Sequence, residues 1–296
     1  MTRDDAQTPP AETAGIIRPP NRPPGWLVPG PAPRTPADRP DLWPGPGEDL
    51  CHLTGDFRIL QHVTGHRWTM DDLVTAYHAA RAVGGAEPRT HVDLGCGIGT
   101  VLLILAWRFP AVRSVGIEVQ DLSAGLAARS VAWNGVDDRV SVRHADFREA
   151  VAAGGLGPVD LVTGTPPYFP VGTGTESVRP QCGPCRFEYR GGVEDYAATA
   201  ARLLAPGAPF VVCGPARDRD RDRAIAAAAA AGLHLRAWHP VIPREGKPPL
   251  IAVCEMRRED GPTVESPPIV VRDLRGHWTD GWKAVRAEMG LPPPTW

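Results

Sequence analysis

The central part of the chain alternates short apolar runs with longer segments in which apolar residues recur at helical spacing. The apolar runs, rich in β-branched residues, predict strands at 90–94, 114–117, 140–142, 159–162, 209–213 and 250–253. The longer segments predict helices at 100–109, 122–134, 147–153, 193–204 and 219–231. Strands that alternate with helices call for parallel pairing with crossover helices. The pattern therefore predicts an α/β fold with a doubly wound sheet.

The end of this region departs from the alternation. Residues 238–243 and 250–253 are both apolar and strand-like, but no long helix separates them. A short connection suits antiparallel strands, whereas parallel strands need a longer crossover. We therefore expect these two segments to close an otherwise mostly parallel sheet as an antiparallel pair.

Proline is concentrated at the front of the chain. The 296 residues contain 34 prolines, of which 13 fall within residues 1–50. Because proline fixes φ and lacks a backbone donor, this stretch predicts a disordered, solvated tail, with a partner-docking polyproline segment as the alternative. The folded domain is expected at 51–296, with an N-terminal segment at 51–88, a core at 89–258 and a C-terminal extension at 259–296.

Composition and charge exclude several classes of protein. No apolar run approaches the roughly 18 residues of a membrane helix, and the first residues lead into prolines and not into an apolar signal segment. Outside residues 1–50, 27 basic residues balance 27 acidic ones, so an RNA partner would need a local basic patch. Six cysteines do not indicate a disulfide scaffold in such a chain. These features predict a cytoplasmic protein with no membrane partner and leave its oligomeric state open.

A glycine-rich turn follows the first predicted strand. In Asp93-Leu94-Gly95-Cys96-Gly97-Ile98-Gly99, the residues Gly95 and Gly97 allow the backbone to pass close to a ligand. The following helix can present its N-terminal N–H groups to that ligand. Glu118 ends the next strand about 20 residues later, where an acid binds ribose hydroxyls in dinucleotide-binding folds. The combination predicts a nucleoside-binding site, although turn geometry alone could also require the glycines.

The charge of Asp93 narrows the choice of ligand. A carboxylate two residues before Gly95 would repel a pyrophosphate but attract a cation. S-adenosylmethionine carries a sulfonium and an ammonium group and no phosphate, so we expect it to be the cofactor. After the third strand, Asp146 would reach the adenine amino group with Phe147 beside the ring. The alternative is that Asp146 only caps the helix that follows.

The fourth strand ends in Thr165-Pro166-Pro167-Tyr168. Open α/β sheets bind ligands at the carboxyl ends of their strands. The two prolines stiffen the turn and direct its carbonyl groups, and Tyr168 offers a flat face for a planar substrate. We therefore expect Thr165, Pro166, Pro167 and Tyr168 to be the catalytic residues. A rigid turn without a function would explain the prolines but not the Tyr168–Phe169 pair.

These motifs resemble those of class I S-adenosylmethionine-dependent methyltransferases with an Asn/Asp-Pro-Pro-Tyr type motif, which act on planar amino groups. The sequence is similar in particular to the bacterial tRNA (valine) adenine-N6 methyltransferase family. The resemblance covers roughly residues 51–290 and includes the segments 61–71, 244–250 and 269–279. It implies a seven-stranded Rossmann-like sheet, mostly parallel, with an antiparallel closing strand.

The resemblance also implies a function. The expected activity is methylation of the N6 atom of an adenine in an RNA, tRNA in the first place, with S-adenosylmethionine as methyl donor. Cofactor binding is then expected of Thr69, Asp93, Gly95, Gly97, Glu118, Asp146 and Phe147. Thr165 stands where the family has Asn, and its hydroxyl can accept a hydrogen bond from the target amine but can also donate one. The alternatives are N-methylation of a protein glutamine, an rRNA guanine or a small molecule, and a non-catalytic cofactor-binding subunit.

Two further patterns favour a structural interpretation. Cys182-Gly183-Pro184-Cys185 has the spacing of a redox pair or half a zinc site, but a plain loop is favoured over a regulatory disulfide or a shared metal, and no metal is expected. The loop 171–190 around it has the length of a substrate lid, in which Arg179, Arg186 and Arg190 could meet phosphates. The alternating arginines and aspartates at 217–223 predict a solvated helix start.

Overall fold

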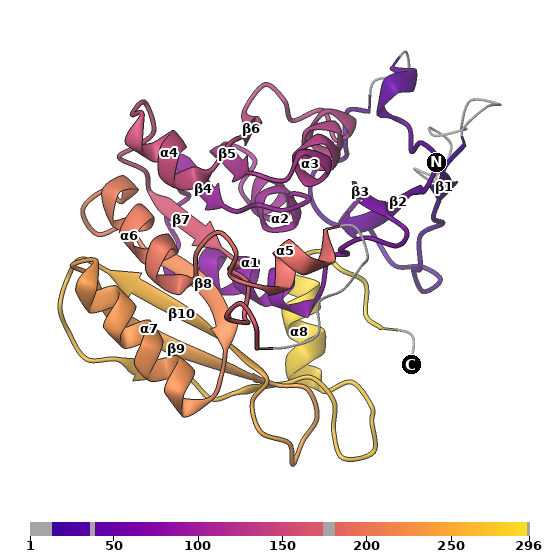
Figure 1. Ribbon diagram of the computed structural model, residues 1–296. Helices are drawn as coiled ribbons and strands as arrows, with labels where there is room; N and C mark the ends of the chain where they lie inside the picture. The colour runs from indigo at the N-terminus through magenta and orange to yellow at the C-terminus, as the bar shows by residue number, and fades with distance from the viewer. Residues whose placement is uncertain (1–13, 36–38, 174–180, 295–296) are drawn as a thin grey trace.

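The computed structural model describes residues 14–35, 39–173 and 181–294 and shows a large sheet covered by helices (Figure 1). The strands of this sheet are β4 (Thr90–Leu94), β5 (Arg113–Glu118), β6 (Val140–His144), β7 (Leu161–Gly164), β8 (Phe210–Pro215), β9 (His234–Ile242), β10 (Ile251–Arg257), β11 (Val264–Glu265) and β12 (Ile269–Val270). Their order is β11-β9-β10-β8-β7-β4-β5-β6, and β12 also pairs with β9.

The middle of the sheet is parallel and its far end is antiparallel. β4 pairs in parallel with β5 and β7, β5 with β6, and β7 with β8. β10 runs antiparallel to both β8 and β9. The seven strands from β4 to β10 are those that the sequence predicts, and the antiparallel closing pair is confirmed. β11 and β12 contribute only two residues each.

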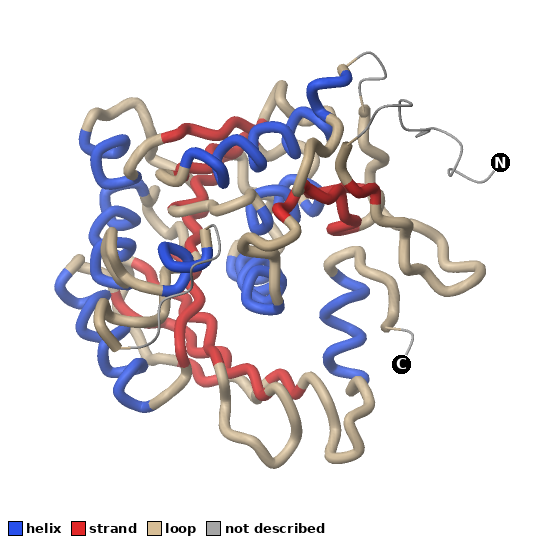
Figure 2. The backbone as a smooth tube through the Cα atoms, turned by 45° about the vertical axis from the view of Figure 1, so that its right-hand side comes forward, coloured by secondary structure: helices blue, strands red, loops and turns tan. Residues whose placement is uncertain are grey.

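Helices cover both faces of the sheet, and Figure 2 shows the strands passing between them. They are α1 (Met70–Ala82), α2 (Thr100–Arg108), α3 (Asp121–Trp133), α4 (Phe147–Ala152), α5 (Cys182–Arg186), α6 (Val193–Leu203), α7 (Asp218–Ala230) and α8 (Asp280–Glu288). The buried side chains of α1, α2, α3 and α8 belong to one core cluster, and those of α4, α6 and α7 belong to another. Alanine-rich α7 and the almost wholly apolar α2 have sequences that favour a helix and suit a face packed on a sheet.

A small second sheet precedes the large one. Its strands are β1 (Ile16–Ile17), β2 (Glu48–Thr54) and β3 (Phe57–His62), in that order. Side chains of α3 bind the backbone of β3: the N–H of Leu60 donates to Ser130 Oγ and the N–H of Arg58 to Asn134 Oδ1, both at 2.9 Å. Polar side chains on a helix thus take the place of a further strand and attach this sheet to the main domain.

The described part of residues 1–50 is not a solvated tail, which corrects the expectation from composition. Arg18 forms an ion pair with buried Asp49 at 2.9 Å, and Arg22 with Asp56 at 2.6 Å. Leu42 is 2% exposed, and the ring of Trp43 packs edge-on against Trp133 at 4.8 Å. The prolines leave room for only the short pairing of β1 with β2, but they do not prevent side chains from packing, so arginine, leucine and tryptophan anchor the segment. Residues 1–13 and 36–38 of the predicted tail, and Arg179 of the predicted lid, lie outside the described residues.

The C-terminal extension folds back onto the front of the domain. Trp282 and Val285 of α8 are buried in the same cluster as α1 and α2. After α8, the carbonyl of Met289 accepts a hydrogen bond from the Thr54 hydroxyl, and that of Gly290 accepts one from the Gly55 N–H. The turn between β2 and β3 is therefore held by the last part of the described chain.

None of the helices in the described ranges is long and apolar enough to cross a membrane.

Candidate functional site

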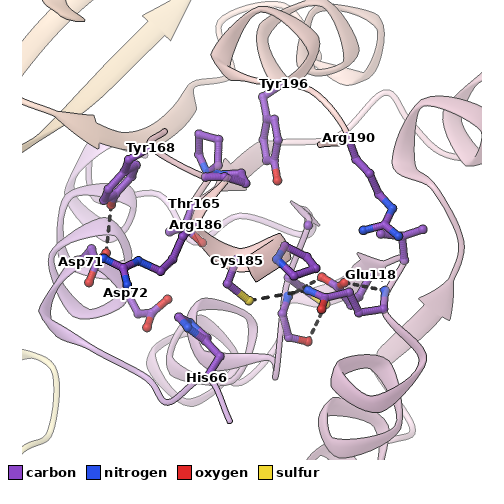
Figure 3. Close-up of a pocket in the computed structure, with 18 of the residues that line it drawn as sticks. His66, Asp71, Asp72, Glu118, Thr165, Tyr168, Cys185, Arg186, Arg190 and Tyr196 are labelled. Carbon is purple, nitrogen blue, oxygen red and sulfur yellow. Dashed lines mark hydrogen bonds between the residues drawn. The ribbon is translucent and has the colours of Figure 1, made fainter. Parts of the chain in front are cut away.

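A cavity of about 550 Å³ lies where β4, β5 and β7 end (Figure 3). Ten of the eleven site residues expected from the sequence line it: Thr69, Gly95, Gly97, Glu118, Asp146, Phe147, Thr165, Pro166, Pro167 and Tyr168. They come from segments that are far apart in the sequence, which parallel strands bring to one edge of the sheet. The exception is Asp93.

The glycine turn forms one wall of the cavity. Gly95 and Gly97 have φ angles of +60° and +56°, which favour glycine. A Cβ on Gly95 would lie 2.2 Å from the hydroxyl oxygen of Tyr196, so this position has no room for a side chain. A Cβ on Gly97 would meet nothing within 4 Å. The absence of a side chain there leaves open space next to the backbone, as a ligand-binding turn requires.

Glu118 connects this turn to the end of β5. Its side chain is only slightly exposed, and it accepts hydrogen bonds from the N–H of Gly97 at 2.9 Å and of Gln120 at 2.7 Å. Burial raises the pKa of Glu118, while these backbone N–H groups act in the opposite direction. A carboxylate has about four lone-pair positions, and two of those of Glu118 are used by these N–H groups. The others can still accept hydrogen bonds from the hydroxyl groups of a ligand in the cavity.

Asp93 lies behind the glycine turn and does not line the cavity. It is 2% exposed, and its carboxylate accepts a hydrogen bond from the Thr163 hydroxyl at 2.7 Å. Asp93 and Thr163 are register partners on neighbouring strands, and the Thr163 hydroxyl also contacts His91 Nε2 at 2.8 Å. Burial raises the pKa of Asp93 to about 7. The side chain of Asp93 thus points towards Thr163 on the neighbouring strand. Direct contact between Asp93 and a cationic ligand, which the sequence led us to expect, is not supported by this position.

Asp146 and Phe147 lie at the start of α4. Asp146 accepts hydrogen bonds from the backbone N–H of Arg148 at 2.9 Å and from its guanidinium at 2.6 Å. The Arg148 side chain holds the pKa of Asp146 below its usual value. Asp146 is therefore a helix cap, the alternative that the sequence left open, and it also lines the cavity. Phe147 packs against the Tyr196 ring with 4.6 Å between their centroids.

The turn after β7 is tied to the start of α1. The Tyr168 hydroxyl donates to Asp71 Oδ2 at 2.9 Å and contacts the Cys213 sulfur at 3.2 Å. The pKa of Tyr168 is raised well above its usual value, mainly by burial and to a smaller extent by the neighbouring Cys213 and Asp71, so the phenol stays protonated. Asp71 also accepts a hydrogen bond from the Thr69 hydroxyl. The ring of Tyr168 is thus oriented by a carboxylate on another element.

Several lining residues were not singled out as site residues from the sequence. Asp71 and Asp72 occupy the first turn of α1, where Asp72 accepts the N–H of Thr69 at 2.9 Å. Burial, reinforced by Asp71, raises the pKa of Asp72. Asp71 falls within the segment 61–71, which carries part of the family resemblance, so the sequence does hold a signal for it. Nothing in the local pattern distinguished Tyr196 on α6 from an ordinary core residue.

The cysteine motif lies beside the cavity, on α5. Pro184 and Cys185 line the cavity, and the Cys185 sulfur accepts a hydrogen bond from the Gln120 amide at 3.6 Å. Burial raises the pKa of Cys185 to about 12, so its thiol is a poor nucleophile. Both cysteines are free thiols, and among the described residues no group of three or more His, Cys, Asp or Glu side chains could hold a metal ion. Arg186 and Arg190 follow and are exposed at the cavity rim.

Several known proteins of related sequence are named as methyltransferases. A protein of Porphyromonas gingivalis named tRNA1(Val) (adenine(37)-N6)-methyltransferase is 28% identical over 165 residues, which cover 55% of this chain and 64% of the relative. A Streptomyces pristinaespiralis protein named 4-amino-L-phenylalanine/4-methylamino-L-phenylalanine methyltransferase is 37% identical over 122 residues, 39% of this chain and 40% of the relative. A Chlorobaculum tepidum protein named release factor glutamine methyltransferase is 32% identical over 93 residues, 31% and 32% of the two chains.

One solved structure supports the fold. A protein of Agrobacterium tumefaciens described as a predicted O-methyltransferase superposes with a TM-score of 0.56 and 18% identity, covering 77% of this chain and 100% of its own. This similarity confirms the Rossmann-like fold. No protein-family model matches the chain. The chain matches 64% of the length of the first two curated relatives, which is less than two thirds of each.

Proposed function

We propose that the protein is an S-adenosylmethionine-dependent N-methyltransferase. The observation that carries this proposal is a single cavity that joins the glycine turn and Glu118 to the segment from Thr165 to Tyr168. A methyl donor and an acceptor must bind side by side for transfer, and the two groups of residues supply a nucleoside site and an amine site within that space. The methyltransferase relatives, which match part of the chain, point the same way.

The residues present fit this cofactor. The open space at Gly97 admits a ligand close to the backbone, and Glu118 can accept ribose hydroxyls. Phe147, Ile117 and Val119 give the same part of the cavity an apolar wall suited to an adenine ring. Asp71 and Asp72 line the cavity, and neither forms an ion pair among the described residues. A positively charged ligand beside them would be attracted to the carboxylate of Asp71 and would lower the raised pKa of Asp72. When bound, the cofactor supplies the electrophilic methyl group.

The chain supplies position and lone-pair alignment. Thr165 and Pro166 line the cavity, and in this mechanism the Thr165 hydroxyl and the Pro166 carbonyl accept hydrogen bonds from the NH₂ group of the acceptor, which leaves the nitrogen lone pair free. The ring of Tyr168, oriented through Asp71, gives the planar acceptor a face to stack on. Once methylated, the acceptor nitrogen carries a positive charge and readily releases its proton to water, so the mechanism needs no strong base in the protein.

As acceptor we propose an adenine amino group in an RNA, with tRNA first. The relative named as a tRNA adenine-N6 methyltransferase supports this choice. Exposed Arg186 and Arg190 at the rim would meet RNA phosphates. A small-molecule amine is the second candidate. Acidic Asp71 and Asp72 near the acceptor motif disfavour a phosphate inside the cavity, and one relative is named for an amino-phenylalanine substrate.

The test is methyl transfer from labelled S-adenosylmethionine to separate RNA, protein and small-molecule fractions, followed by nucleoside analysis of the RNA. Label in N6-methyladenosine supports the first acceptor. Label confined to small molecules supports the second acceptor and excludes RNA. No label in any fraction, despite measurable binding of S-adenosylhomocysteine, contradicts the enzymatic function and favours a cofactor-binding subunit.

Thr165 provides a matched pair of variants for the same assay. Thr165→Ala removes the hydrogen-bond acceptor and should lower transfer, whereas Thr165→Asn restores an acceptor oxygen and should retain it. Equal activity of the wild type and Thr165→Ala would show that the hydroxyl does not bind the acceptor amine.

A further inference from the structure

Tyr196 lines the cavity, and its contacts within the fold explain its ring but not its hydroxyl group. It belongs to the first turns of α6, its side chain is 5% exposed, and its ring packs edge-on against Phe147. Its ring therefore serves the core. Phenylalanine would serve the core equally well, so the hydroxyl needs a separate explanation.

Two glycines make room for this side chain. A Cβ on Gly95 would lie 2.2 Å from the Tyr196 hydroxyl oxygen, and a Cβ on Gly164 would lie 2.6 Å from its Cδ1 atom. Gly95 begins the turn after β4, and Gly164 directly precedes the acceptor motif. Tyr196 thus occupies the point at which the nucleoside side and the acceptor side of the cavity meet.

The hydroxyl points into the cavity, between Tyr168 and Thr165 on one side and Glu118 and Arg190 on the other (Figure 3). Within the part of the chain that the structure describes, it forms no hydrogen bond. Buried hydroxyl groups in folded proteins usually have a partner, and one without a protein partner at a cavity surface is available to a ligand.

The surroundings keep this group a donor. Burial raises the pKa of Tyr196 well above its usual value, and the nearby carboxylates of Glu118 and Asp93 act in the same direction. The phenol therefore remains protonated at neutral pH and can donate its proton to an acceptor atom of a bound molecule.

We propose that the Tyr196 hydroxyl donates a hydrogen bond to bound S-adenosylmethionine and is a further cofactor-binding residue of this site. This inference rests on the proposed function, since it takes the cofactor from it. The hydrogen bond is made only in the bound state, because the protein itself offers the hydroxyl no partner.

Tyr196→Phe tests the proposal, with calorimetric binding of S-adenosylhomocysteine as the readout. The variant keeps the ring and removes only the hydroxyl. Loss of one neutral hydrogen bond should weaken binding by about 3- to 10-fold. The melting temperature of the ligand-free protein should not change, because no internal hydrogen bond is lost. Tyr77→Phe, on α1 and not among the cavity residues, is the matched control and should change neither quantity.

The outcomes separate this inference from the proposed function. Wild-type affinity in Tyr196→Phe overturns the role of the hydroxyl while leaving the cofactor site intact. A lower melting temperature of the ligand-free variant also overturns it, because the hydroxyl would then have a structural partner. Absence of binding by the wild type contradicts the proposed function itself. Repeating the titration of both proteins with 5′-methylthioadenosine, which lacks the amino-acid part of the cofactor, locates the hydrogen bond. If Tyr196→Phe again binds more weakly than the wild type by a similar factor, the acceptor atom lies on the nucleoside. If the two proteins bind it equally well, the acceptor atom lies on the amino-acid part.

Discussion

Tyr168 depends on a residue almost a hundred positions earlier for its orientation, because its hydroxyl is bound by Asp71. Tyr168→Ala removes the stacking face but touches none of the groups around Glu118. We expect turnover to fall by on the order of 100-fold, because misplacement of an acceptor by about 1 Å has that effect. The affinity for S-adenosylhomocysteine should stay within about twofold, as a cavity wall on the acceptor side contributes little to nucleoside binding.

Variants of Asp71 test the same hydrogen bond, between the Tyr168 hydroxyl and Asp71, by changing its acceptor. Asp71→Asn keeps an oxygen that can accept the Tyr168 hydroxyl, whereas Asp71→Ala does not. Turnover should therefore be higher in Asp71→Asn than in Asp71→Ala. If cofactor affinity falls in step with turnover in Tyr168→Ala, or if both Asp71 variants are equally impaired, the orientation of Tyr168 is not what the contact provides.

Asp93 should make stability depend on pH. Its pKa is about 7 in the folded protein against an ordinary value of 3.8, because it is buried. The folded state therefore holds a proton that the unfolded state has released, so its contribution to stability is full below about pH 4 and is lost as the pH rises through about 7. Relative to Asp93→Asn, the wild type should lose up to about 4 kcal/mol of unfolding free energy over that range.

Urea denaturation of both proteins at several pH values measures this difference. His91, whose pKa burial lowers to about 3, acts in the opposite direction but is present in both proteins and cancels. A difference in stability that does not change with pH would show that Asp93 ionises normally inside the fold.

At the scale of elements, α5 is fixed to the domain through the residue before it. Gln181 is buried with a φ of 67°, its amide oxygen accepts the His66 N–H at 3.3 Å, and its amide nitrogen donates to Ser123 Oγ at 2.8 Å. Gln181→Ala loses both bonds and keeps the unfavourable φ. We expect it to cost about 2 kcal/mol, which lowers the melting temperature by about 4 to 8 °C in a protein of this size.

Gln181→Gly is the matched variant, because glycine adopts this φ without strain. It should recover about 1 kcal/mol relative to Gln181→Ala. Thermal unfolding of the two variants decides the point. If Gln181→Gly is the less stable of the two, backbone strain at this residue is negligible.

The elements that the sequence predicts are those whose signal is local. Strands β4 to β10 are short apolar runs, and helices α2, α3, α4, α6 and α7 follow their strands with clear spacing. The β2–β3 hairpin and α8 were not predicted as such, because they are stabilised from a distance. Strand β3 is bound by Ser130 and Asn134, and α8 is buried against α1 and α2.

The site follows the same rule. The glycine turn, Glu118 and the Thr165–Tyr168 segment are local motifs at strand ends, so they could be placed in one cavity from sequence. Tyr196 could not, because its position depends on gaps left by Gly95 and Gly164 in other elements. Asp93 was expected at the ligand because its distance from Gly95 is short in sequence, but the strand turns its side chain towards Thr163.

At the scale of the whole molecule, the described part of the proline-rich front, residues 14–35 and 39–50, packs on the folded domain. Leu42 is 2% exposed, whereas Leu27, in the same segment, is 88% exposed. Leu42→Ala should destabilise the protein by about 3 kcal/mol through lost burial and a cavity. Leu27→Ala is the matched control and should stay within about 0.5 kcal/mol. Chemical denaturation measures both. Equal stability of the two variants would mean that the segment does not contribute to the cooperative core.

The contact between the β2–β3 turn and the end of α8 has a consequence for biosynthesis. The Thr54 hydroxyl and its acceptor, the carbonyl of Met289, are 235 residues apart. At a translation rate of roughly 5 to 20 residues per second, the hairpin leaves the ribosome on the order of ten seconds or more before its partner is made. The two hydrogen bonds that close the β2–β3 turn can therefore form only after nearly all of the remaining domain has been synthesised, although the contacts of β3 with Ser130 and Asn134 can form earlier.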